Sequence, residues 1–110
     1  MNTNLKECNR LDVLELTGEL RESKSRSPLR NAIVGKGKSL ESVALPFFVE
    51  DERGNEYGLL VSLESVIEFQ FNEDLNELKK WKESKEPEGD YDDVYREVEW
   101  TREMLKNKDI

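Results

Sequence analysis

The sequence predicts an α+β fold, in which a small curled antiparallel β-sheet, or a small barrel in the style of SH3 and Sm domains, is followed by two C-terminal helices. Two apolar runs flank "EDERGNE", whose glycine suits a hairpin loop. Apolar and polar residues alternate in "SVIEFQF", as on a half-buried strand. Beyond Asn72 the apolar period becomes helical. The length of 110 residues fits one domain, 1–110.

The N-terminal part of the sequence carries signals of both a strand and a helix. Residues 1–10 are expected to be a loose lead-in, and residues 11–71 to be mainly β-structure. In "RLDVLELTGEL" the leucines alternate as on a strand, whereas Asp12 followed by Glu15 resembles a helix capping box. The density of Val, Leu and Thr favours the strand, because Gly18 would weaken a helix.

The segment 21–38 is expected to be a basic loop, with a short strand at "NAIV", because serines, proline and glycines interrupt any period. Its basic residues are candidate contacts for an anion or for nucleic acid: Arg21, Lys24, Arg26, Arg30, Lys36 and Lys38. The alternative is a solvated loop that pairs with the chain's own acids. "AIVGKGKS" matches a permissive phosphate-binding pattern, but the strand and helix that such a loop needs are not predicted around it.

The pentapeptide SLESV occurs twice, at residues 39–43 and 62–66. Each copy is a polar lead into an apolar stretch, so we expect both to open strands of one sheet. The first strand is apolar on both faces and is predicted to be central, although Pro46 argues against full pairing on both edges. The second alternates and is predicted to be more exposed.

Residues 72–108 are expected to be helical. Asn72 is a good N-cap for a first helix, with acids in its first turn, lysines near its end and a stop at Pro87. A second helix is expected from Tyr91 to Lys106.

The second helix carries the candidate partner contact. Trp100 and Met104 lie nearly opposite the face that the other apolar residues share. Together with the acids Asp92, Asp93 and Glu97 they are predicted to bind a partner. The competing interpretation is that the helix lies in a groove and buries two sides.

The composition argues against catalysis. The chain has no histidine, which removes the usual general base at neutral pH and the commonest metal ligand. The one cysteine, Cys8, cannot form an internal disulfide or a thiolate zinc site. We therefore expect no enzyme, no cofactor and no metal. No apolar run suits a signal peptide or a membrane span, which favours a cytoplasmic location and no membrane partner.

The charge is unevenly distributed. The net charge is −8, yet residues 1–49 hold eight basic against six acidic side chains, and residues 50–110 hold nine against nineteen. Such polarity favours a macromolecular partner. The sequence therefore predicts a small acidic non-enzymatic protein that binds another protein, as an inhibitor, regulator or accessory subunit, with a homodimer left open. The alternatives are a nucleic-acid-associated small barrel that uses the basic loop, and an acidic mimic of nucleic acid that uses the last helix.

Overall fold

The computed structural model describes the backbone of residues 3–86, 92–108 and 110, and the side chains of residues 13–86, 98–108 and 110. Two helices come first, α1 (Thr3–Glu22) and α2 (Ser27–Gly35), joined by the short 3-10 turn η1 (Lys24–Arg26). Four strands follow a second 3-10 turn, η2 (Leu40–Ser42). They are β1 (Ala44–Glu50), β2 (Asn55–Val61), β3 (Val66–Asn72) and β4 (Glu77–Ser84), and the chain then forms α3 (Asp92–Lys106).

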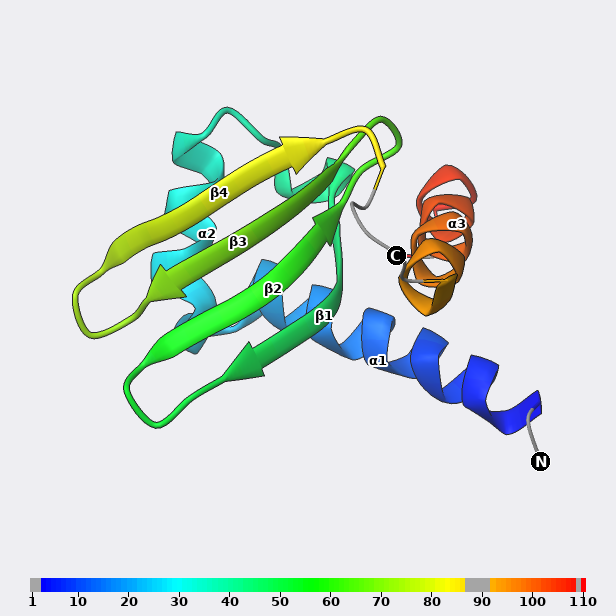
Figure 1. Ribbon diagram of the computed structural model, residues 1–110, viewed down its shortest axis with the longest axis horizontal. Helices are drawn as coiled ribbons and strands as arrows, with labels where there is room; N and C mark the ends of the chain where they lie inside the picture. The colour runs from blue at the N-terminus through cyan, green and yellow to red at the C-terminus, as the bar shows by residue number, and fades with distance from the viewer. Residues whose placement is uncertain (1–2, 87–91, 109) are drawn as a thin grey trace.

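The four strands form one antiparallel meander in the order β1-β2-β3-β4. The α+β class is therefore confirmed. The sheet is open, with β1 and β4 at its two edges, so the barrel form is not confirmed. Helices α1 and α2 lie behind the sheet in Figure 1, and α3 packs beside the end where β1 begins and β2 stops.

The expected loose N-terminus and the expected strand at residues 11–20 are both wrong, because residues 3–22 form helix α1. The buried residues Val13, Thr17 and Leu20 recur at the helical spacing. Leu14, which a strand would place on the same apolar face as Leu20, is 40 % exposed. Gly18 is tolerated in the helix, since packing of the buried face outweighs its low propensity.

The expected loop at 21–38 is also largely helical, and "NAIV" belongs to α2 rather than to a strand. Pro28 stands in the first turn of α2, where its missing N–H costs nothing. Leu29 and Ile33 are one turn apart and fully buried. They pack into the main core with Leu20 and Phe69.

The helix expected after Asn72 is wrong as well, because the chain turns and forms β4. The side-chain oxygen of Asn72 accepts a hydrogen bond from a backbone N–H, as a helix cap would. The donor is Leu75 N in the β3–β4 turn, at 2.8 Å, and no helix follows. Asn76 completes the turn with a φ of 50°. Leu78 then lies opposite Phe71, and Trp81 opposite Phe69. The helix expected at the C-terminus is confirmed as α3.

Both copies of SLESV open a strand, as predicted. The first copy passes through η2 into β1. The second passes into β3 through a turn, in which Ser62 N donates to Ser65 O at 2.9 Å. The predicted burial is reversed, however. β1 is an edge strand and β3 is an inner one.

Gly58 gives the sheet a close contact that only glycine permits. A Cβ at this position would lie 2.5 Å from Phe69 Cζ and 2.9 Å from Phe47 O. We expect Gly58→Ala to lower the free energy of unfolding by about 1–3 kcal/mol through overpacking. Urea denaturation measures this. Gly35→Ala is the control, since nothing lies within 4 Å of a Cβ built there, and equal stability of the two variants would contradict the expectation.

Candidate functional site

The face of the sheet that points away from α1 and α2 carries exposed apolar side chains, and we call it the outer face. Phe47 and Val49 of β1 are 49 % and 46 % exposed, and Tyr57 of β2 is 38 % exposed. Val49 pairs directly with Tyr57, and Phe47 with Leu59. Phe47, Val49 and Tyr57 therefore form one surface, the outer patch, on two neighbouring strands.

Helix α3 defines one limit of the outer patch. Its Val98 packs against Leu59, Val61 and Val66, which are nearly or fully buried. Beyond α3's reach the same face is open. On its far side the open face is polar, where Lys80 of β4 pairs with Glu68 of β3 at 3.2 Å. The apolar part of the open face is thus confined to the β1 side.

The outer patch lies beside an unpaired sheet edge. Asp51 N donates to Asn55 O at 2.9 Å, so by antiparallel alternation Val49 and Phe47 also turn their backbone groups toward β2. The N–H and C=O groups of Phe48 and Glu50 then point outward, and none bonds to another described segment. The start of β1 is held from within, because Leu45 N donates to Thr17 Oγ1 of α1 at 2.9 Å.

The two edges of the sheet differ in chemistry. The β4 edge carries Lys79, Lys80 and Lys82, and lysines on an edge strand discourage pairing with other chains. The β1 edge has Phe47 and Val49 instead, with one missing donor at Pro46. Of the two, β1 is therefore the edge suited to accept another strand.

Arg26 braces β1 from the inner face. Its guanidinium lies 4.4 Å from the centre of the Phe48 ring and donates to Glu50 Oε1 at 2.7 Å. A second carboxylate, that of Glu56 on β2, lies 3.7 Å away. One cation thus holds two successive inward side chains of the edge strand, which keeps that half of β1 extended.

Glu56 is a buried acid without a full set of partners. It is 1 % exposed, and its Oε2 accepts no hydrogen bond from any described residue. Burial raises its pKa to about 7, against the attraction of Arg26, with further small increases from Glu73 and Glu50. Glu56 belongs to β2 and its side chain is almost fully buried, so a substrate does not reach it in this structure and we assign it no catalytic role.

The predicted basic site is mostly engaged inside the chain. Arg21 donates to the carbonyls of Leu40, Glu41 and Val43. Arg30 donates to those of Leu20 and Ser23, both at 2.8 Å. Lys38 pairs with Glu83 at 2.6 Å, a hydrogen bond that holds the pKa of Glu83 below its usual value.

With Arg26 occupied as well, Lys24 and Lys36 are the two members of the predicted set that remain exposed without a described partner. Four of the six predicted basic residues therefore already make contacts within the chain, and the predicted contact with an anion or nucleic acid stays a prediction. The glycines and lysines of "AIVGKGKS" follow helix α2 and no strand, so the phosphate-binding context is missing there.

Trp100 and Met104 are 8 % and 6 % exposed and pack with Val13 of α1 and Ala44 of β1. Val98 is buried on another side of the same helix. The interpretation in which α3 buries two sides therefore fits the structure, and the exposure on which the predicted contact depended is not found. The side chains of Asp92, Asp93 and Glu97 lie outside the described residues.

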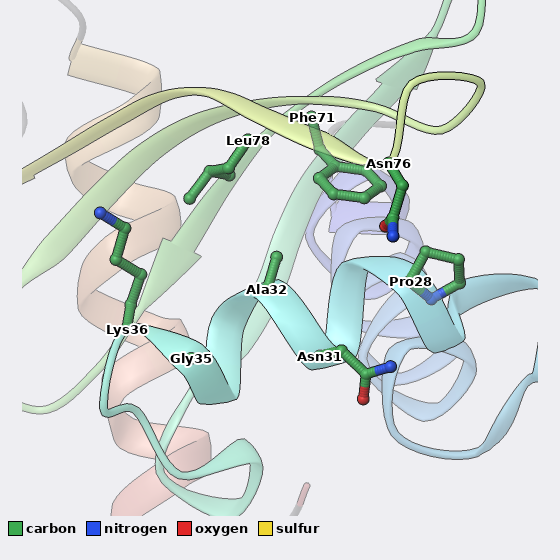
Figure 2. Close-up of a pocket in the computed structure, with 8 residues that line it drawn as sticks. All are labelled: Pro28, Asn31, Ala32, Gly35, Lys36, Phe71, Asn76 and Leu78. Carbon is green, nitrogen blue, oxygen red and sulfur yellow. The ribbon is translucent and has the colours of Figure 1, made fainter.

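An open groove of about 420 Å³ lies between α2 and the β3–β4 hairpin (Figure 2). Pro28, Asn31, Ala32 and Gly35 line its helical wall, and Phe71, Asn76 and Leu78 line the other. Lys36 stands at one end. The lining offers one lysine and two amides, with no carboxylate, thiol or hydroxyl beside the lysine to form a reactive pair.

The described residues hold no group of three or more acids, histidines or cysteines that could bind a metal ion. Within them, no helix combines the length and apolar character needed to cross a membrane. Comparison of the chain with protein-family models, with curated proteins and with solved structures finds no match. The outer patch and the adjoining β1 edge, which sequence reasoning missed, are the best candidate functional site.

Proposed function

We propose that this chain is a non-enzymatic protein-binding module, an inhibitor, regulator or accessory subunit, that contacts another protein through the outer patch. The observation that carries the proposal is the grouping of Phe47, Val49 and Tyr57, all more than a third exposed, on two paired strands. Exposed large apolar side chains that gather on one face are typical of interaction sites. Tyrosine and phenylalanine are also enriched where protein surfaces meet.

The distribution of charge supports a protein partner more than a nucleic acid. Four of the six basic residues from Arg21 to Lys38 form hydrogen bonds or ion pairs within the chain. The net charge of −8 repels a phosphate backbone. The lack of any histidine supports the non-enzymatic part of the proposal, as does the lining of the groove between α2 and the β3–β4 hairpin, which holds no carboxylate or thiol.

Capture from extract of the native host tests the function. The tagged chain is compared with a Phe47→Ser/Val49→Ser variant, which makes the outer patch polar. The control is Val34→Ser/Leu75→Ser, which removes two apolar side chains that are at least as exposed, at 53 % and 62 %, from elsewhere on the surface. We expect a protein that the wild type and the control retain and that the patch variant loses by about tenfold or more. Retention by all three would contradict the proposal.

Nucleic acid is the second candidate, because one observation favours it. Phe47 and Tyr57 present aromatic rings on the open face of an antiparallel sheet, a surface on which unpaired bases can stack. Titration of labelled single-stranded DNA and RNA at two salt concentrations tests it. Binding at low salt that weakens steeply with added salt would favour this candidate, and absence of binding at low salt would eliminate it.

A further inference from the structure

We propose that the partner contributes an extended segment with basic residues, which adds to β1 as a further strand of the sheet. This inference rests on the proposed function, since it names the chemistry of the partner at the outer patch. A strand that adds to a sheet edge gains main-chain hydrogen bonds, and its alternate side chains fill the pockets of one face. The β1 edge meets both conditions.

The backbone of β1 offers bonds at defined positions. The outward groups are the N–H and C=O of Phe48 and of Glu50. Pro46 itself has no N–H, so an added strand pairs fully only along the second half of β1. That is the half that Arg26 braces, and it lies beyond the contact of Thr17 with Leu45.

Side chains of the added strand that point to the outer face would lie beside Phe47 and Val49. On their other side, Phe47 and Val49 already pair with Leu59 and Tyr57 of β2. Apolar residues at every second position of the partner would therefore extend the outer patch by one strand and remove Phe47 and Val49 from water.

Exposed acids near this edge favour a basic partner, with Arg53 as an exposed cation in the same hairpin loop. The exposed acid Glu41 precedes β1, and the exposed acids Asp51 and Glu52 follow it. Glu50 is 49 % exposed at its side chain and shares one arginine with Glu56. An extended segment with lysine or arginine at its two ends complements these acids.

The same charges disfavour a second copy of this chain as the occupant. Antiparallel pairing of β1 with β1 would bring together two chains of net charge −8. Because α1 packs against β1, such pairing would also bring two α1 helices together. Each α1 exposes the acids Glu15, Glu19 and Glu22. Like charges across an interface discourage association.

The experiment uses two synthetic peptides, Lys-Val-Thr-Val-Thr-Val-Lys and the same sequence with glutamate in place of lysine. Amide hydrogen exchange of the full chain is followed residue by residue by NMR as each peptide is added. The outward amides of Phe48 and Glu50 should exchange about tenfold or more slowly with the lysine peptide, because a new strand satisfies them. The amide of Val49 already faces β2, so its exchange should change little.

Charge variants test the basic specificity. Glu41→Lys/Glu52→Lys is expected to weaken the lysine peptide by roughly three- to tenfold at low salt, and less at high salt. The control Glu64→Lys/Glu103→Lys makes the same change in net charge at exposed acids of the β2–β3 turn and of α3. Asp51 is left intact because its carboxylate accepts from the backbone of Arg53 and Asn55 in the hairpin.

The outcomes separate the two proposals. Peptide contact without slower exchange at Phe48 and Glu50, equal binding of both peptides, or no response to the lysine peptide would overturn strand addition. The function would then still depend on the capture experiment with the Phe47→Ser/Val49→Ser variant. Slow exchange of the two outward amides in the chain alone, together with a dimer mass in light scattering, would overturn the inference in favour of a second copy.

Discussion

Trp100→Ala is expected to lower the free energy of unfolding by about 3–5 kcal/mol, the range for removing a large aromatic side chain from a packed core. Trp100 is 8 % exposed and joins α3 to α1 and β1 through Val13, Ala44 and Met104. Loss of the ring leaves a cavity at the point where three elements meet. Denaturation in urea, followed by circular dichroism, measures the change.

Two further variants make the result specific. Glu99→Ala changes the exposed neighbour on α3 and should leave the stability within about 0.5 kcal/mol of wild type. Trp100→Phe keeps part of the volume and should cost less than the alanine, which gives a measurable folded variant if Trp100→Ala unfolds. If Trp100→Ala matches wild type in stability but loses a captured protein, the tryptophan is a partner contact after all.

Glu56→Gln is expected to stabilise the protein at pH 8 by on the order of 3 kcal/mol and to have little effect at pH 4.5. Burial raises the pKa of Glu56 from 4.5 to about 7. Between these values the folded state holds a proton that the unfolded state has released. Below pH 4.5 this pKa shift therefore takes nothing from the free energy of unfolding. The free energy of unfolding then falls as the pH rises from 4.5 to 7.

Glutamine keeps the shape of the protonated acid and cannot ionise, so this part of the pH dependence should vanish. Arg26 loses its 3.7 Å contact with Glu56 but keeps its hydrogen bond to Glu50. Free energies of unfolding measured from pH 4.5 to 8 test the expectation. Glu64→Gln, at an exposed acid of a turn, is the control. A wild-type protein whose stability changes with pH as the glutamine variant's does would refute the assignment.

The elements with local signals were predictable. The glycine of the β1–β2 hairpin, Gly54, has a φ of 80°, as the sequence indicated. Alternation located β3, and the 3.6-residue period located α3. The β4 strand was not predictable, because Asn72 and the acids after it imitate a helix cap and Leu78 and Trp81 are three apart. Pairing with Phe71 and Phe69 decides the outcome, and that pairing is tertiary.

The candidate site depended on the order of the strands, which no local pattern encodes. Val49 and Phe47 are apolar, as is Phe48 between them, so β1 resembled a strand covered on both faces. Its place at the edge exposes Phe47 and Val49, and Pro46 was the one local sign of that place. The contacts of the basic residues within the chain were not predictable for a related reason. Arg21 and Arg30 bind carbonyl oxygens of other segments, and such contacts leave no mark on the spacing of charges.

The claim that the outer patch binds a protein is tested most directly by mapping the footprint of the captured protein on the isotope-labelled chain. On binding, the largest changes in amide chemical shift are predicted at Phe47, Val49 and Tyr57. The outward amides of Phe48 and Glu50 are predicted to shift as well. A footprint on the groove between α2 and the β3–β4 hairpin, with the outer patch unchanged, would contradict the account.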